Sequence, residues 1–358
     1  MTDNHFIQLH LLISYPPSNP NRDQLGQPKT AIVGGTQRSR ISSQSLKRAW
    51  RNSEIWKNDG LKIGTRTREL FISPEYGLYD KLLKKLDDDE GTAIKISGLI
   101  LSAFAKTATV KQKPEARIDE KYVGKKIVTE QPIHFSDIEI ERIKKLVETL
   151  DKEPTKDHLE KLFDKNPRTI DMALFGRMIA KRPDRNIEAA VQVGHAISIN
   201  EVEIEDDFFT AVDDLNRHGS AHMNEQEFVS AIYYLYLCID TKTLLKNLSY
   251  NKDLAGTSLK ALVKAAAMVA PTGKQNSYAN RAQAFYILAE KGDAQPRNLS
   301  LAFLKAMPAD DPQKAINQLT TIRDKFNNAY PKPASYKEMN LFGEGKLKDI
   351  VDFVGKLS

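Results

Sequence analysis

The sequence predicts an α+β fold, in which a β-sheet core carries a helical insertion and a protruding loop. Three segments rich in apolar, β-branched or aromatic residues indicate strands, and helical segments lie between them along the 358 residues. A charged stretch from about residue 57 to residue 166 is typical of helices, and an acidic, turn-rich stretch begins near residue 201. This order of elements favours a sheet of ferredoxin-like or RRM type with two appendages.

The first strand is expected at "FIQLHLLIS", residues 6–14. Its alternate residues are the apolar Ile7, Leu9, Leu11 and Ile13. Because side chains alternate between the two faces of a strand, this strand should bury one face and lie centrally in the sheet. The next stretch, residues 15–29, contains four prolines and is expected to be an exposed loop.

A helix is expected over "SQSLKRAWRNSEIW", residues 43–56. Ser42 or Ser43 can cap it, since a serine hydroxyl accepts a hydrogen bond from an amide at the start of a helix. Leu46, Ala49 and Trp50 share one face of this helix, and its cations fall on the other side.

Further strands are expected at "FVSAIYYLYLCI", residues 228–239, and at "QAFYILAE", residues 283–290. Between them, residues 257–270 indicate a helix that begins with a threonine. The C-terminal part, residues 310–329 and 345–355, is expected to be helical.

The positive charge of the chain is concentrated in one short stretch. The formal net charge is +6, and residues 22–51 alone contribute seven cations against the single acid Asp23. These cations are Arg22, Lys29, Arg38, Arg40, Lys47, Arg48 and Arg51. A localised excess of this kind is typical of a protein that binds a polyanion, and the alternative is a solvated basic helix face.

The same stretch has the features of a phosphate-binding site. Gly34 and Gly35 allow close approach of a backbone, and a capped helix start can offer free amides to an anion. Arg40, Lys47 and Arg48 add positive charge, while Ser42, Ser43 and Gln44 can add neutral hydrogen bonds. Neither a P-loop nor a G-x-G-x-x-G pattern is present, so the expected ligand is a nucleic-acid backbone.

The single cysteine, Cys238, excludes disulfides and multi-cysteine zinc sites, and we expect a small buried thiol. No apolar run is long enough for a membrane span, and the N-terminus lacks the pattern of a secretory signal. We therefore expect a cytoplasmic protein with no membrane partner.

The residues of the basic stretch resemble the N-terminal signature of the CasC family, the repeated backbone subunit of the type I-E CRISPR surveillance complex, Cascade. The matching residues here are "NRD" at 21–23, Lys29, "GG" at 34–35 and "RISSQSLKRA" at 40–49. Later matches, in the order of the family, are "GRM" at 176–178, "HAI" at 195–197, "FTAVDDL" at 209–215, "GSAH" at 219–222, "QEF" at 226–228, and "KQ" with Tyr278 in "GKQNSY". The matched blocks spread over about two thirds of the chain, but no motif matches in residues 57 to about 166 or after Arg297.

The resemblance implies the architecture of a right hand. An RRM-like palm would comprise residues 1–56, 189–200 and 225–358, helical fingers 57–188, and a thumb loop 201–224. Copies would stack head to tail along a CRISPR RNA, together with other Cascade subunits, and the guide bases would pair with target DNA. The family is a scaffold, so the resemblance implies no catalytic residue, no cofactor and no metal.

The resemblance also assigns roles to particular residues. RNA phosphates and sugars would be held by Arg22, Lys29, Ser42, Gln44, Lys47, Arg48 and Arg51, with Lys274 and Gln275 in the same role. Arg40 and Ser43 join them as members of the phosphate-binding site described above. Met178 would wedge beside a displaced base. The thumb would carry Phe208, Phe209, Thr210 and His222, although the family often has a tryptophan where this chain has Phe208.

Several other residues have a catalytic or metal-binding alternative. His218 and His222, near Asp213 and Asp214, could hold a metal, but Gly219 between the histidines favours a loop. Asp23 lies where related backbone subunits of other CRISPR types carry a catalytic aspartate. The rival function is therefore an endoribonuclease that uses His10 or His222, or a metal with Asp23 or Asp213. A monomeric single-strand RNA-binding module is a third possibility, and His195 is expected to be a core histidine.

The insertion contains many lysines, which could form a second basic surface that guides DNA. The candidates are Lys111, Lys113, Lys125, Lys126, Lys144 and Lys145, with Lys106, Arg117 and Lys121 nearby. Neighbouring acids cancel part of this charge, so a solvated face is an equally valid alternative.

Overall fold

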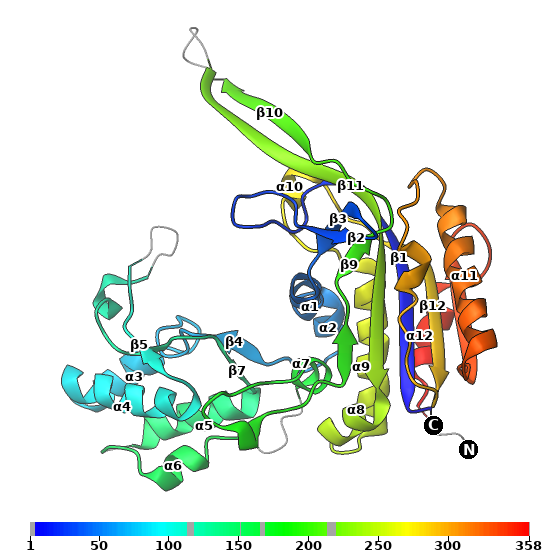
Figure 1. Cartoon of the computed structure of the whole chain (residues 1–358). Coiled ribbons are helices and arrows are strands. Elements are labelled where there is room, and N and C mark those ends of the chain that lie inside the picture. Colours follow the sequence, from blue (N-terminus) through cyan, green and yellow to red (C-terminus); the bar gives the residue numbers. More distant parts are fainter. Residues whose placement is uncertain (1–3, 113–117, 151, 165–168, 213–219, 358) are drawn as a thin grey trace. The chain divides into compact units, whose positions relative to one another are not determined.

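The computed structural model describes residues 4–112, 118–150, 152–164, 169–212 and 220–357. The chain forms two compact units (Figure 1). The first comprises residues 1–60, 191–245 and 251–358, and the second comprises 61–190 and 246–250. The main segment of the second unit and the insertion expected at 57–188 thus differ by only a few residues at each end.

The first unit is built on an antiparallel sheet that has nine strands over the described residues. Its order is β13-β12-β1-β11-β9-β3-β2, and β8 and β10 pair with other parts of β11. The strands are β1 (Phe6–Ser18), β2 (Thr30–Val33), β3 (Thr36–Ile41), β8 (Val191–Val193), β9 (Ala196–Ser198), β10 (Glu205–Val212), β11 (Ser220–Asp240), β12 (Ala284–Gly292) and β13 (Ser335–Asn340). The expected sheet core with mixed α and β elements is confirmed.

The first strand is central, as expected, because β1 pairs with β11 on one side and with β12 on the other. The expectation that it buries only one face is wrong, since residues 7–13 are all buried. Leu12 packs with Phe303 and with Leu319 of α11 on one side of the sheet. The polar residues of this face are buried as well, and hydrogen bonds satisfy them: Tyr236 Oη donates to Gln8 Oε1 at 2.9 Å.

Helices of the first unit are α1 (Ser43–Arg51), α2 (Glu54–Asn58), α9 (Lys252–Met268), α10 (Gln275–Tyr278), α11 (Pro312–Ala329) and α12 (Leu347–Gly355), with a short η3 (Ser300–Phe303). α8 (Thr241–Asn247) continues from the end of β11. The helix expected over 43–56 is broken between α1 and α2. Ser53 there has an extended ψ of 149°, and its hydroxyl donates to Trp50 O at 2.7 Å.

A hairpin and an extension of β1 are among the features of this unit that the sequence did not predict. β2 and β3 form a hairpin whose turn is Gly34 and Gly35, with φ of 59° and 82°. Positive φ at both central residues is what a two-residue hairpin turn of type I′ requires, so this turn explains the glycine pair. β1 also runs on to Ser18, into the stretch expected to be loop.

β10 and the first part of β11 form a long hairpin within the first unit (Figure 1). Its register pairs Glu205 with Phe228 and Phe208 with Glu225. The strand β11 then continues without a break into the centre of the sheet. The protruding segment expected at 201–224 is thus anchored to the core by its own backbone.

The second unit is mainly helical. Its elements are β4 (Thr65–Thr67), α3 (Leu78–Lys85), α4 (Glu90–Phe104), β5 (Thr107–Ala108), η1 (Glu120–Tyr122), β6 (Val128–Thr129), β7 (Ile133–Phe135), α5 (Asp137–Thr149), α6 (Lys156–Glu160), α7 (Ile170–Phe175) and η2 (Pro183–Arg185). Ile96, Phe104 and Ile143 lie in its apolar core. The buried Glu139 accepts from Arg177 Nη1 at 2.7 Å and from the amide of Ser136, and so ties the start of α5 to the chain after α7.

Candidate nucleic-acid interface

A groove of about 890 Å³ lies in the first unit, between the loop at residues 20–26, one flank of α1 and the segment 269–274. Three segments far apart in the sequence each contribute a cation to it: Arg22, Arg48 and Lys274. Asp23 is the acidic residue among its lining residues. We call this surface the basic groove. Its cations are three of the residues that the family resemblance assigned to RNA.

The loop on one side of the basic groove is held by a short turn. Asp23 Oδ1 accepts hydrogen bonds from the amides of Leu25 at 2.8 Å and Gln27 at 3.0 Å. The side chain of Asn19 donates to Gly26 O at 2.9 Å. An aspartate that organises its own turn is a structural role, and it leaves Leu25 85% exposed and Arg22 exposed at the rim.

The segment on the opposite side approaches this loop closely. A Cβ atom on Gly273 would lie 2.4 Å from Pro20 O, so only glycine fits there. The buried Asn280 donates to Gly273 O at 3.1 Å and fixes the turn. Lys274 follows with φ of +51° and lines the basic groove, while Gln275 is half-buried as the first residue of α10.

At the start of α1, three of the amides that the sequence suggested for an anion already have partners in the protein. The amide of Ser42 donates to Asn21 Oδ1 at 2.8 Å, that of Ser43 donates to His195 Nδ1 at 2.9 Å, and that of Ser45 donates to Ser42 Oγ at 3.3 Å. Ser42 and Ser43 are only 7% and 8% exposed. Their expected contacts with RNA remain predictions, but Ser42 already serves as the helix cap.

The cations of α1 divide between two flanks of the helix. Arg48 is exposed and lies with Ser45 and Asn52 on the flank that lines the basic groove. Lys47 and Arg51 project about 100° and 60° away from Arg48 around the helix, on the flank that also carries the exposed Gln44. Both are half-buried, and burial lowers the pKa of the Lys47 ammonium.

Arg38 does not belong to the binding surface, although it is one of the seven cations of the basic stretch. Its side chain is 0% exposed. The guanidinium donates to Ser198 O and Ile199 O at 2.8 Å each, and to the carbonyls of Phe303 and Leu304 at 3.2 and 3.3 Å. Arg38 therefore joins β3 to two distant segments.

Gly34 likewise has a packing role. A Cβ on Gly34 would lie 1.7 Å from Leu304 O, so the turn sits directly against the backbone after η3. The proposed close approach of a phosphate to this glycine is contradicted, because protein already occupies the space. A Cβ on Gly35 would meet nothing within 4 Å.

A second group of basic residues lies at the start of α1. Lys29 and Arg40 are half-buried, and the amide of Arg40 donates to Lys29 O at 2.8 Å. His195, expected in the core, is exposed beside them. Burial of part of the ring, and then the positive charges of Arg40 and Lys29, lower the pKa of His195 below 6.5. Sequence reasoning missed this histidine, and its place in the matched "HAI" block was the one available signal.

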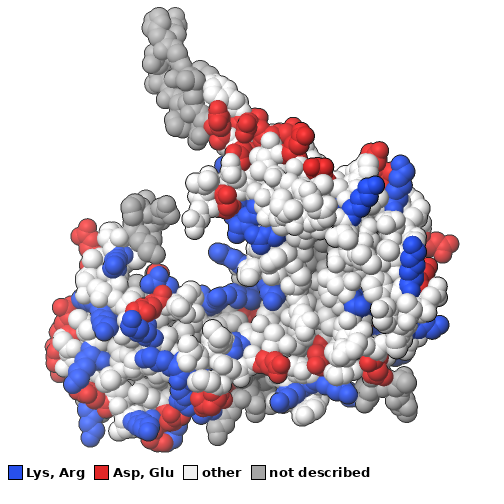
Figure 2. All heavy atoms as spheres, viewed as in Figure 1, with Lys and Arg blue, Asp and Glu red and all other residues white. Residues whose placement is uncertain are grey.

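Three of the four expected thumb residues, Phe208, Phe209 and Thr210, lie on β10. Phe208 is 60% exposed, Thr210 is exposed and Phe209 is half-buried. His222 pairs with Ala211 in the hairpin, but its side chain lies outside the described residues, as do Asp213, Asp214 and His218. The base of the hairpin is acidic, and Asp and Glu side chains gather there in Figure 2. They include Glu203, Glu205, Asp206 and Asp207, all exposed.

Met178, in the second unit, is 77% exposed. It follows Gly176, whose φ is +77° and where a Cβ would lie 2.8 Å from Ile187 O, and the buried Arg177. The chain is therefore fixed on one side of Met178, and an exposed apolar side chain at a fixed point suits contact with a base.

The described lysines of the second unit have different surroundings. Lys125 pairs with Glu90 and Lys144 with Glu141, and their ammonium groups lie over the rings of Tyr79 and Tyr76. Lys145 is exposed on α5 and Lys113 lies outside the described residues.

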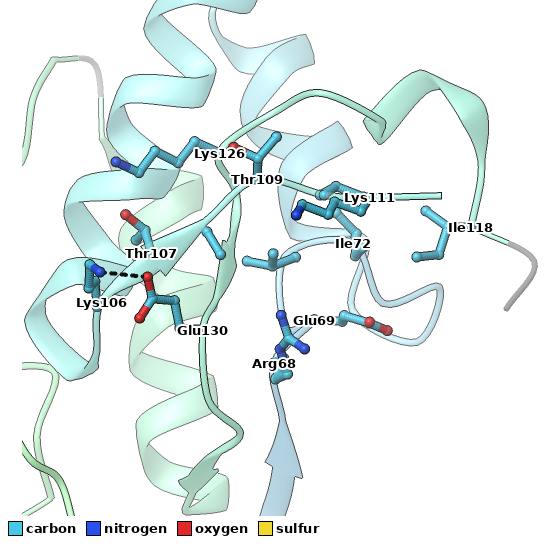
Figure 3. A pocket seen from close by; sticks show the side chains of 13 residues that line it. Arg68, Glu69, Ile72, Lys106, Thr107, Thr109, Lys111, Ile118, Lys126 and Glu130 are labelled. Carbon is cyan, nitrogen blue, oxygen red and sulfur yellow. Dashed lines mark ion pairs between the residues drawn. The ribbon is translucent and has the colours of Figure 1, made fainter. Parts of the chain in front are cut away.

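Lys111 and Lys126 line a pocket of about 600 Å³ together with Arg68 and Lys106 (Figure 3). Lys106 pairs there with Glu130 at 2.8 Å. The second basic surface that guides DNA remains a prediction.

His10 cannot act on RNA in this structure, because its ring is 0% exposed. Nδ1 lies 2.8 Å from Tyr234 Oη and Nε2 lies 3.3 Å from Glu290 Oε2. Burial lowers its pKa in spite of the nearby carboxylate. Cys238 is buried, as expected, and burial raises the pKa of its thiol to about 11.

Within the described part of the chain, no helix combines the length and the apolar character that a membrane span requires.

Comparison with known proteins gives a family and a fold. Residues 7–349 match the family model described as "CT1975-like protein". No curated protein matches the sequence. A solved chain from a structure described as "CRISPR RNA-guided surveillance complex, pre-nicking" matches with a TM-score of 0.79 and 24% identity, over 98% of this chain and 99% of that one. A chain from another "CRISPR RNA-guided surveillance complex" matches with a TM-score of 0.58 and 22% identity, over 96% and 91%.

Proposed function

Because the chain belongs to the CT1975-like protein family, which confirms the resemblance to CasC-type proteins, we propose that it is a CRISPR RNA-binding backbone subunit of a type I-E Cascade complex. In this role it holds the sugar–phosphate backbone of the guide in the cytoplasm and leaves guide bases free to pair with target DNA. The central strands of the first unit are its RRM-like palm, the second unit its fingers, and the β10–β11 hairpin its thumb.

The basic groove is the observation that carries the proposal. Arg22, Arg48 and Lys274 come from three segments that are each fixed by side-chain or backbone contacts, and they line one surface. Such a surface suits phosphate oxygens, which carry no sequence information. A subunit that must accept any guide should bind the backbone, and leave sequence recognition to base pairing.

In this proposal several copies of the protein bind one RNA side by side and form a filament, in which each copy uses the same binding surface and the same thumb. Copies that contact one another head to tail make an interface that does not close on itself, so the RNA sets the length of the array. Phe208, exposed on β10, is placed for stacking on a base. Met178 serves beside the displaced base. The exposed lysines near the pocket of the second unit, Lys111 and Lys126, contact target DNA in this proposal.

The protein is proposed to be a scaffold without catalytic activity. The endoribonuclease alternative loses His10, which is buried, and Asp23 already organises its own turn through one carboxylate oxygen. His222 and Asp213 remain to be tested by experiment, because their side chains lie outside the described residues.

Purification from cells that express a CRISPR RNA tests the proposal. We expect a discrete small RNA to co-purify with several copies of the protein, and size-exclusion chromatography to show multi-copy assembly. Incubation with guide and target RNA, with and without magnesium, should give no cleavage. Discrete products that disappear in His222→Ala or Asp213→Asn would replace the scaffold with a nuclease, and binding by a single copy would indicate a monomeric RNA-binding module.

A further inference from the structure

His195 is an exposed histidine whose backbone is fixed by the sheet. It lies in the two-residue link between β8 and β9, both of which pair with β11. The amide of the preceding Gly194 donates to Tyr236 O at 2.9 Å, so the link stays on the sheet. β9 pairs with the end of β3, where the chain turns into α1. This topology brings His195 to the first residue of α1.

The hydrogen bond between the two elements determines the state of the ring. The Ser43 amide can only donate, and its acceptor is His195 Nδ1 at 2.9 Å. Nδ1 must therefore be unprotonated, and a neutral ring carries its proton on Nε2. The lowered pKa of His195 agrees with this state.

The ring lies among cations at the surface. Arg40 on β3 and Lys29 in the preceding loop are the charged groups that act on it most strongly. All three side chains are at least partly exposed. A phosphodiester, with its two unesterified oxygens and its ester oxygens, can accept hydrogen bonds from two cations and one neutral N–H at the same time.

We propose that His195 is an RNA-contacting and positioning residue: its Nδ1 holds the first amide of α1, and its Nε2–H donates to a backbone oxygen of the guide strand beside Lys29 and Arg40. This inference rests on the proposed function. It makes His195 a neutral contact, in contrast to the charged contacts of the basic groove, and it links that contact to the helix that carries Arg48.

Two substitutions test the roles of the two ring nitrogens of His195 separately. In His195→Asn, the amide oxygen can replace Nδ1 as the acceptor for Ser43, but no atom remains at the position of Nε2. In His195→Gln, the longer side chain can place its amide N–H near the position of Nε2, but no acceptor remains for Ser43. We would measure the affinity for a short labelled single-stranded RNA at several salt concentrations, and the urea midpoint of unfolding without RNA.

His195→Asn should keep the urea midpoint and weaken RNA binding by about 2- to 10-fold, the effect of one neutral hydrogen bond. The slope of log affinity against log salt should not change, because no charge is lost. His195→Gln should lower the urea midpoint and bind RNA more tightly than His195→Ala. Wild-type affinity in His195→Asn would overturn the proposal, and so would a flatter salt slope, which would mean that the ring is charged in the complex.

Arg48→Gln distinguishes failure of this inference from failure of the proposed function. It should flatten the salt slope by about 0.7, the contribution of one phosphate contact to a single strand. If Arg48→Gln weakens binding and His195→Asn does not, only the role of His195 fails. If neither variant changes binding, the RNA lies on another surface and the placement of the binding site fails as well.

Discussion

Neutralising the three cations of the basic groove should remove a defined part of the salt dependence of RNA binding. The variant carries Arg22→Gln, Arg48→Gln and Lys274→Gln together. Each phosphate contact contributes about −0.7 to the slope of log affinity against log salt for a single strand. Three contacts therefore account for a slope of about −2, which changes affinity by roughly 20-fold between 50 and 200 mM salt.

The assay is fluorescence anisotropy with a labelled single-stranded RNA of about eight nucleotides, titrated at several salt concentrations. A matched control replaces three exposed lysines of the same unit that lie outside the basic groove, Lys325, Lys332 and Lys348, with glutamine. Both variants lose the same net charge. The comparison therefore separates the effect of where the cations lie from the effect of the net charge of the protein. The control should keep the wild-type slope to within the effect of one contact.

A groove variant with the wild-type slope would refute the assignment of phosphates to this surface. An equal flattening in groove variant and control would refute it as well, because the effect would then come from net charge. Circular dichroism should show both variants folded, since Arg22, Arg48 and the three control lysines are exposed.

Three further predictions concern stability. Arg38→Met should lower the free energy of unfolding by about 3 kcal/mol, because three buried backbone carbonyls and a partly buried one lose their donor; a change in the urea midpoint that corresponds to less than about 1 kcal/mol would contradict this. Gly34→Ala should destabilise the protein well beyond Gly35→Ala, since both residues have positive φ and cost about 1 kcal/mol as alanine, but only the first adds a clash with Leu304 O; equal melting temperatures would show that the contact is not formed. Stability should also fall as pH falls below 6.5: the buried ring of His10 has a lowered pKa and stays neutral in the folded state, whereas the unfolded state takes up a proton. The melting temperature at pH 5.5 and 7.5 tests this, and an unchanged pH dependence in His10→Gln would assign the effect to another group.

Local patterns in the sequence were sufficient to locate several strands and helices. Period-two alternation located β1, and a serine followed by helical spacing located α1, because strand and helix formation and capping depend on nearby residues. The same argument explains why the break between α1 and α2 and the strand β13 were missed. Nothing in the sequence distinguishes Ser53 from an ordinary helix residue. The residues of β13 are polar and largely exposed, and this strand is stabilised mainly by its pairing with β12.

Locating the binding site required both the sequence and the tertiary structure. By itself the sequence determined that the positive charge is concentrated in residues 22–51, and the motifs there were specific enough to identify the family, which the family model confirms. Which cations are available was decided by tertiary structure alone. Arg38 and Arg48 are chemically identical and ten residues apart, yet one bonds to carbonyls in the interior and the other lines the basic groove.

Contacts between segments that are distant in the sequence are the physical reason why the sequence alone could not show which cations are available. Lys274 joins Arg48 because Gly273 packs against Pro20, and His195 reaches α1 because β9 pairs with β3. Burial of a side chain, and the partner of each polar group, depend on segments that come together only when the sheet forms. Composition and periodicity fix which groups a stretch contains, while the folded chain decides which of them meet solvent and which meet each other.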